Sequence, residues 1–259
     1  MELAAQANLT HAALMDHDTL DGVDRALQTA KKFNIGFIPG VELSVNHGET
    51  KIHMLVYFLE PGDGPLQSRL GALRDGRGTR NVQIVERLNH LGYAITHEDV
   101  ARQAAGPSVG RPHIADALIE KGYIASRDEA FSDLLHDGGA AYVGRDRLTA
   151  EDAIGLSRAS GGVPVIAHPV TMGLTRDGFS KAFTELTALG LGGIEAHHPM
   201  HIIELRDHLT ELAANLGIAA TGGSDYHGSG KRAYRVGTGR GDLRVPESAV
   251  EQLYEQRNR

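Results

Sequence analysis

Short apolar runs rich in β-branched residues alternate along the chain with stretches of helical periodicity. This alternation is typical of βα units around a mostly parallel sheet. The predicted strands lie at residues 12–15, 36–38, 52–58, 163–167, 193–196 and 218–220. We therefore expect an α/β fold with these strands in one central sheet.

Residues 65–150 follow a different pattern, in which no alternating strand stands out. Their predicted elements are amphipathic helices at 69–91 and 112–121 and turns at 106–107 and 137–139. We expect residues 65–150 to form a mainly helical insert that covers the functional site. Residues 1–64 and 151–259 would then form one discontinuous barrel domain.

Acidic and histidine side chains close or follow several of the apolar runs. They are Asp16, His17, Glu42, His168, Glu195 and Asp225. Strands of a barrel or an open α/β sheet bring their carboxyl ends to one edge, where such folds gather catalytic groups. These residues predict a site at that edge, whereas Asp207 and His208 lie in a helical stretch.

The composition limits the chemistry of this site. The chain has 26 basic and 33 acidic residues, a formal charge of −7, so we expect no duplex DNA partner. No apolar run approaches the roughly 20 residues that span a bilayer, and the acidic N-terminus lacks signal-peptide features, so we expect a cytoplasmic protein without membrane contact. There is no cysteine, which leaves any metal to His, Asp and Glu.

His17 and Glu42 are the first two candidate metal ligands. His17 lies between Asp16 and Asp18 after an apolar run. Asp18 or Thr19 could instead cap a following helix, which is compatible with metal binding by His17. Glu42 follows a predicted glycine turn at 39–40, from which its carboxylate could point inward and bridge two cations. The alternative is an exposed glutamate at a strand end.

His53 and His168 extend this set of candidates. His53 begins a very apolar strand, where a lone histidine could also be a hydrogen-bonded core residue. His168 is followed by Pro169, which we expect to hold it extended and to end the strand. That position favours a ligand role for His168.

The string of residues 222–227, Gly-Gly-Ser-Asp-Tyr-His, is the most specific motif. Its small residues allow close backbone approach, and Asp225 and His227 could serve adjacent cations. Other histidines have no acidic or glycine-rich setting at a strand end, and we expect them to be structural or solvated. They are His11, His47, His90, His97, His136 and His208.

Two basic strings offer a possible anion site. Arg111-Pro112-His113 starts a predicted helix of the insert, and Lys231-Arg232 follows the Asp225 motif. Both could be solvated surface charge. Alternatively, the Arg111 guanidinium matches two phosphate oxygens while His113 donates to the same group.

Taken in order, six motifs resemble the polymerase and histidinol phosphatase (PHP) superfamily. They are Asp16-His17-Asp18-Thr19, Pro39-Gly40-Val41-Glu42, Ile52-His53, Arg111-Pro112-His113, Ala167-His168-Pro169 and Gly223-Ser224-Asp225-Tyr226-His227. The insert and the Arg-Pro-His string resemble the small nucleotide-phosphatase branch, whose relatives remove phosphate from nucleotides or trim RNA from its 5′ end. The resemblance implies a distorted (β/α)7 barrel with up to three divalent ions, Mn, Zn or Fe, at its mouth.

The resemblance also implies a role for each matching residue. Glu42 would bridge the first and second metals, and Asp225 would bind the first. His53 and His168 would complete the second site, and His17 and His227 would hold the third. Phosphate would lie near the catalytic residues Arg111 and His113, with Lys231 as a further substrate-binding residue, and hydrolysis would be metal-assisted.

One departure from the family pattern is large. The family opens with Asp-Leu-His-x-His-Thr and then Ser-Asp-Gly, and this chain has no such string. Six strands are predicted where the family has seven, and residues 1–5 resemble the helix that follows the missing part. We therefore expect the first strand to be missing and fewer metal ions to bind, with the site of Glu42, His53 and His168 complete. A start downstream of the true one is preferred to a natural truncation, because losing a central strand exposes sheet edges.

The sequence thus predicts a metal-dependent phosphoesterase that hydrolyses phosphate from a nucleoside monophosphate or 3′,5′-bisphosphate. One alternative is a 5′-to-3′ exoribonuclease acting on short 5′-phosphorylated RNA. Another is a truncated, non-catalytic remnant that binds metal or nucleotide. An amidohydrolase-type barrel is disfavoured, because no lysine occupies the mid-barrel position where that class bridges its metals.

Overall fold

The structure is a computed structural model that describes residues 1–104, 109–144, 147–228 and 233–259. The chain forms two compact units. One contains Met1–Arg69 and Arg147–Arg259, and the other contains Leu70–Asp146. The predicted turn at 106–107 lies outside the described residues.

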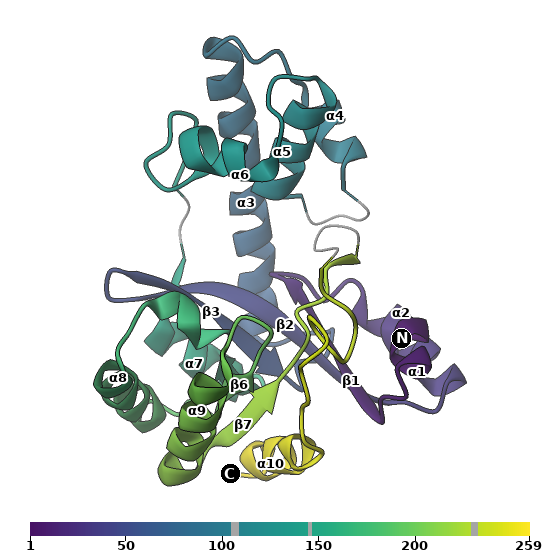
Figure 1. The fold of residues 1–259 in the computed structure, drawn as a ribbon, viewed down its shortest axis with the longest axis vertical. Coiled ribbons are helices and arrows are strands. Elements are labelled where there is room, and N and C mark those ends of the chain that lie inside the picture. The colour runs from purple at the N-terminus through teal and green to yellow at the C-terminus, as the bar shows by residue number, and fades with distance from the viewer. Residues whose placement is uncertain (105–108, 145–146, 229–232) are drawn as a thin grey trace. The chain divides into compact units, whose positions relative to one another are not determined.

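The first unit is built on a mixed sheet that curls into a half-barrel with helices around it (Figure 1). Its strands are β1 (His11–His17), β2 (Gly36–His47), β3 (Thr50–Tyr57), β4 (Leu148–Thr149), β5 (Val163–Ile166), β6 (Gly193–His197) and β7 (Ala219–Gly222). Their order is β1-β2-β3-β5-β6-β7, and β4 pairs with β2. All six predicted strands are confirmed, and only the two-residue β4 was not predicted.

Strand β3 runs antiparallel to both of its neighbours, whereas the other pairs are parallel. The cause is local. His47 pairs with Thr50, so only Gly48 and Glu49 join β2 to β3, and a two-residue loop can connect only antiparallel strands. Gly48 adopts the positive φ of 56° that such a turn requires. The amino end of β3 therefore lies beside the carboxyl ends of its neighbours.

The predicted turn at residues 39–40 is wrong, because β2 continues through it to His47. Gly40 meets a different demand. A Cβ atom at this position would lie 2.5 Å from the carbonyl oxygen of Val56 on the neighbouring strand. The glycine allows close strand approach, and Glu42 consequently lies within a regular strand instead of beyond its end.

Helices surround the half-barrel, and the last of them also contributes to its interior. They are α1 (Glu2–Gln6), α2 (Val23–Lys32), α7 (Ala150–Ala159), α8 (Arg176–Ala188), α9 (Ile203–Leu216) and α10 (Ser248–Arg257). Leu253 of α10 packs with Leu55, Val165 and Ala219 from three strands. The predicted helix at residues 1–5 is confirmed as α1. The alternative of a helix cap at Asp18 or Thr19 is not observed, because the N-cap residue of α2 is Gly22, and Thr19 Oγ1 accepts the Asp21 N–H at 3.2 Å instead.

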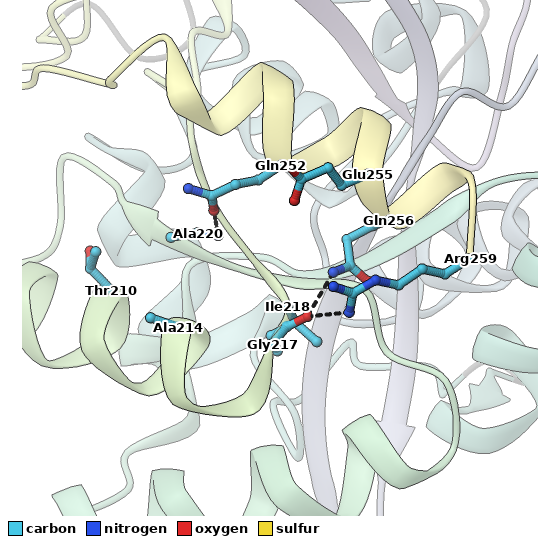
Figure 2. Close-up of a pocket in the computed structure, with 9 residues that line it drawn as sticks. All are labelled: Thr210, Ala214, Gly217, Ile218, Ala220, Gln252, Glu255, Gln256 and Arg259. Carbon is cyan, nitrogen blue, oxygen red and sulfur yellow. Dashed lines mark hydrogen bonds between the residues drawn. The ribbon is translucent and has the colours of Figure 1, made fainter.

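Helix α10 also covers the outer edge of β7 (Figure 2). The Gln252 side chain accepts a hydrogen bond from the Ala220 backbone N–H at 2.8 Å, and Gln256 and Arg259 donate to the carbonyl oxygen of Gly217. These residues line a pocket of about 230 Å³ between α9, β7 and α10. The Gln252 side chain therefore satisfies a backbone N–H of β7 that a further strand would otherwise pair with.

The second unit is helical. It holds α4 (His97–Arg102), α5 (Arg111–Glu120), α6 (Arg127–Ala130), a π-helical turn (Phe131–Leu135) and all but the first residues of α3 (Pro65–His90). Its own core includes Ile84, Leu88, Ile114, Leu118 and Leu135. Both predicted helices and the turn at 137–139 are confirmed. Within the described residues, no helix combines the length and the apolar character needed to cross a membrane.

Candidate active site

His17, Glu42 and His53 come together because of strand register. His17 pairs with Glu42 across β1 and β2, and His53 pairs with Ser44, two residues along from Glu42 on the same face of the sheet. The Glu42 carboxylate lies 2.7 Å from His53 Nδ1 through Oε1 and 3.6 Å from His17 Nε2 through Oε2. One ligand atom from each residue falls within 4.8 Å of the others, an arrangement that could hold a metal ion.

His168 approaches the same carboxylate from the end of β5, which neighbours β3 on the side away from β2. It follows β5, and its Nε2 lies 3.3 Å from both Glu42 Oε1 and His53 Nδ1. The strand does end before Pro169, but the expectation that His168 is extended is wrong. Its φ of 29° and ψ of 59° are in the left-handed region, because the chain turns directly into a 3-10 helix at Pro169–Met172.

Asp225 and His227 lie in the loop that follows β7. Asp225 also has a positive φ, 49°. His227 Nδ1 donates to the backbone carbonyl of Asp225 at 2.8 Å, which leaves its Nε2 lone pair available to a ligand. The rings of His17 and His227 have centroids 6.3 Å apart, so this loop lies beside the end of β1.

The charge on Glu42 is stabilised by the imidazoles around it. Burial by itself would raise the pKa of Glu42, but His17, His168 and His53 outweigh it and hold this pKa well below its usual range. Burial would lower the pKa of His168, but the hydrogen bond to Glu42 and the charge of Glu42 raise it. The charges and hydrogen bonds of these histidines thus stabilise the buried Glu42 carboxylate in its ionised form.

The hydrogen bonds of His168 test whether a metal fits here. Thr171 Oγ1 donates to the His168 carbonyl at 3.1 Å, so it accepts from Nδ1–H of the same histidine at 3.3 Å. Nε2 then presents a lone pair to the Glu42 carboxylate, and two acceptors at 3.3 Å need a proton or a cation between them. Ligand atoms of a four-coordinate zinc-type ion lie about 3.3 to 3.6 Å apart, so the residues fit a divalent metal.

Two further residues of β6 and its loop reach the site, and neither was among the predicted metal ligands or substrate-binding residues. Glu195 is buried, and its Oε2 accepts the backbone N–H of His168 at 2.7 Å. Burial, opposed by His168, raises the pKa of Glu195 to about 8. His198 is fully buried. It accepts the Met200 N–H at Nδ1 and points Nε2 at Asp225 Oδ2, 3.5 Å away. Both residues close or follow an apolar run, which predicts a place at this edge of the sheet. We made that prediction for Glu195 and not for His198.

Arg111 and His113 belong to the helical unit, at the first turn of α5. Arg111 donates to the carbonyl of Leu135 at 2.7 Å, and its guanidinium lies over the rings of Phe131 and Tyr142. His113 Nδ1 accepts the N–H of Gly110 at 3.0 Å. Burial, with help from nearby arginines, lowers the pKa of His113, so its Nε2–H is a neutral donor. Lys231 and Arg232 lie outside the described residues.

The curled sheet thus gathers carboxylates and imidazoles with metal-ligand spacing at the carboxyl edge of its parallel strands. Divalent ions held by such a site would polarise an ester and activate water, which is the chemistry of a metal-dependent hydrolase.

Comparison with known proteins identifies the bond that is hydrolysed as a phosphoester. A 3′,5′-nucleoside bisphosphate phosphatase from Chromobacterium violaceum is 30% identical over 226 residues, covering 87% of this chain and 79% of the relative. A phosphoribosyl 1,2-cyclic phosphate 1,2-diphosphodiesterase from Eggerthella lenta is 30% identical over 250 residues, covering 95% and 92%. A 5′-3′ exoribonuclease from Haemophilus influenzae is 30% identical over 215 residues, covering 83% and 78%.

The fold has a solved counterpart as well. A structure described as a metal-dependent phosphoesterase from Bifidobacterium adolescentis superposes with a TM-score of 0.86 at 28% identity, covering 98% of this chain and 88% of the other. No family model matched the chain. The chain belongs to the PHP-like phosphoesterases, and it is a hydrolase of phosphoesters.

Proposed function

We propose that this protein removes phosphate from a small nucleotide, either a nucleoside monophosphate or a 3′,5′-bisphosphate, with the help of divalent metal ions. The observation that carries the proposal is the Glu42 carboxylate, which lies within 3.6 Å of three imidazole nitrogens contributed by three different strands or loops. The substrate class is taken from the similarity to the nucleoside bisphosphate phosphatase.

We assign the ligands as follows. Glu42, His53 and His168 hold one ion, Glu42 and Asp225 share a second, and His17 and His227 contribute to a third. Bound divalent ions would supply a Lewis acid for the phosphate oxygens and an activated water. The protein's part is to orient the imidazole lone pairs, as the Thr171 hydroxyl does for His168, and to keep Glu42 ionised.

The helical unit would provide substrate contacts. In this proposal residues 65–150 form an insert, and Arg111, His113 and Lys231 are the substrate-binding residues. Arg111 uses one Nη1 to hold the Leu135 carbonyl, and its packing on two aromatic rings limits the directions its guanidinium can take. Arg111 also pairs with Asp137 Oδ1 at 3.4 Å, and a phosphate bound here would compete with that carboxylate for the guanidinium.

We further propose that the half-barrel corresponds to a distorted (β/α)7 barrel without its first strand. Among the described strands, β1 pairs only with β2 and β7 pairs only with β6, and a strand added between them would have to take the place of the Gln252 side chain at the Ala220 N–H. Such a strand would also bring the family's His-x-His ligands to the metals. Fewer than three ions would therefore bind to this chain.

Exoribonuclease activity is the second candidate, because a 5′-3′ exoribonuclease is as similar to this chain as the bisphosphate phosphatase. The two activities differ in product. A phosphatase releases inorganic phosphate from a mononucleotide, whereas an exoribonuclease releases nucleotides from the 5′ end of RNA.

The decisive experiment measures metal content and products together. Purified protein is analysed for Mn, Zn and Fe per chain and then assayed with adenosine 3′,5′-bisphosphate, with AMP and with a 5′-phosphorylated RNA pentamer. We expect phosphate release from a mononucleotide that stops after chelation and in Glu42→Ala. Hydrolysis that persists without divalent metal would refute the proposal. Full metal occupancy without hydrolysis of any substrate would favour a non-catalytic metal-binding protein.

A further inference from the structure

The backbone at His168 is unusual for its residue type. A left-handed conformation at φ 29° is uncommon for any residue except glycine, and a following proline restricts the preceding residue further. Strand β5 ends at Ile166, and Ala167 donates the last backbone hydrogen bond to β3, at the His53 carbonyl, 3.0 Å away, so His168 is the first residue beyond the sheet. Yet His168 Nε2 must point at Glu42 and His53 for all three to share one ion.

Glu195 supplies the missing constraint. Its Oε2 accepts the His168 N–H at 2.7 Å, a short bond between a carboxyl oxygen and a backbone amide. Glu195 itself lies in β6 between Ile194 and Ala196, which are both fully buried, and it pairs with Thr221 of β7 just before the register of the two strands shifts. The anchor is therefore a buried strand residue, and only 5% of Glu195 is exposed.

The surroundings of Glu195 leave its side chain little freedom. A Cβ atom on Gly223 would lie 3.4 Å from Glu195 Oε1, so the loop after β7 covers the other carboxyl oxygen. The charges of Glu42 and Asp225 lie near enough to raise its pKa. The carboxyl group is thus confined between the two segments that carry His168 and Asp225.

We infer that Glu195 is a positioning residue that fixes the backbone of His168 and thereby aims its Nε2 at the metal shared with Glu42 and His53. The inference rests on the proposed metal site. This positioning role requires an acceptor oxygen at the distance that a glutamate side chain provides. It does not require the carboxylate charge. A metal-ligand or acid–base role would instead require the ionisable carboxyl group.

Three substitutions separate these roles. Glu195→Gln keeps the acceptor oxygen and removes the ionisable carboxyl group, Glu195→Asp keeps the carboxyl group and withdraws the oxygen by one methylene, and Glu195→Ala removes both. Ser157→Ala, which removes another fully buried polar group whose Oγ donates to the Ala153 carbonyl, is the matched control. Binding of Mn²⁺ alone to metal-stripped protein is measured by titration calorimetry, followed by kcat and KM with adenosine 3′,5′-bisphosphate.

We expect Glu195→Gln to bind Mn²⁺ within about threefold of the unsubstituted protein, and Glu195→Ala to lose about 10- to 100-fold in affinity, as is usual when the support of a metal ligand is removed. Glu195→Asp should fall between them, with a loss in kcat and little change in KM. If Glu195→Ala does not fold, the order of the Gln and Asp variants carries the test.

A Glu195→Gln protein that binds Mn²⁺ as poorly as Glu195→Asp would overturn the inference in favour of a charged role. An unchanged affinity in Glu195→Ala would overturn it as well. The calorimetric result does not depend on turnover. If no nucleotide is hydrolysed while the three affinities follow the expected order, the proposed function fails and the inference about Glu195 stands.

Discussion

The candidate site combines two groups of ligands that the chain builds in different ways. The amino-terminal group, His17, Glu42 and His53, lies within regular strands β1, β2 and β3. The carboxyl-terminal group, His168, Asp225 and His227, lies beyond the ends of β5 and β7. Two members of the second group, His168 and Asp225, have left-handed backbones, and no member of the first does.

This difference shows two solutions to the same geometric problem. In a strand, register alone sets which side chains meet, so the amino-terminal group needs no special support. Beyond a strand end the backbone has no ladder to define it, and side chains must hold it. Glu195 bonds the His168 backbone, and His198 points at the Asp225 carboxylate. The carboxyl-terminal group should therefore be the more sensitive to substitutions outside the ligands.

Removing the residue that joins both groups should have the largest effect. Glu42 contacts His17 and His53 of one group and His168 of the other. We expect Glu42→Ala to lower kcat/KM by at least about 100-fold, since loss of a ligand should exceed the 10- to 100-fold cost of losing a ligand's support. Glu49→Ala, in the exposed β2–β3 loop, is the control. A smaller loss would mean that the two groups do not share one centre.

The edge of the sheet next to the carboxyl-terminal group can be tested through Gln252. Without its side chain, the Ala220 N–H on β7 loses its partner, at a cost of about 1 to 3 kcal/mol. We expect Gln252→Ala to lower the free energy of unfolding in urea by that amount. Glu255→Ala, from the same helix and the same pocket, should change it by less than about 0.5 kcal/mol. Equal effects of the two substitutions would contradict a role for Gln252 at this edge.

The relative stability of glycine and alanine variants should be reversed between the two groups of ligands. At His168 the positive φ favours glycine, so in metal-free protein His168→Gly should be more stable than His168→Ala by about 1 kcal/mol. At His53, in the extended β3, His53→Ala should be the more stable by roughly 0.5 to 1 kcal/mol. Each pair loses the same imidazole, which leaves the backbone as the variable. Urea unfolding in chelator measures both pairs, and the same sign at both positions would refute the comparison.

The smallest expected effect is in the helical unit. Its loss of folding stability at low pH must be distinguished from the loss caused by protonation of the ligands in the other unit. Asp99 accepts the Thr96 N–H at 2.8 Å and pairs with Arg102 and Lys121, and these contacts, led by the Thr96 backbone, hold its pKa well below the usual range. A lowered pKa means that this stabilisation is present above the unfolded pKa of about 3.9 and is lost as the pH falls below it.

We therefore expect Asp99→Asn to lower stability at pH 7 and to flatten its decline below about pH 4. Circular dichroism during thermal unfolding at each pH gives the measurement, with Asp133→Asn, a carboxylate elsewhere in the same unit, as the control. A decline as steep as that of the unsubstituted protein would assign the acid sensitivity to other groups.

Much of the fold could be predicted because its causes are local. Apolar runs located six strands, and helical periodicity located α3 and α5. The errors arose where a local signal had a non-local cause. Gly40 marks close contact with Val56 on another strand and not a turn, and Pro169 follows a left-handed histidine that a distant glutamate holds.

The sequence by itself determined which side chains can bind metal and that they occur at or near strand ends, because residue identity and hydrophobic periodicity are properties of neighbouring positions. Only the tertiary structure decided how those side chains meet. Register placed His17 and His53 beside Glu42. Hydrogen bonding across 27 positions of sequence tied His168 to Glu195, and no local pattern encodes such a pair because the sheet, not the chain order, makes them neighbours.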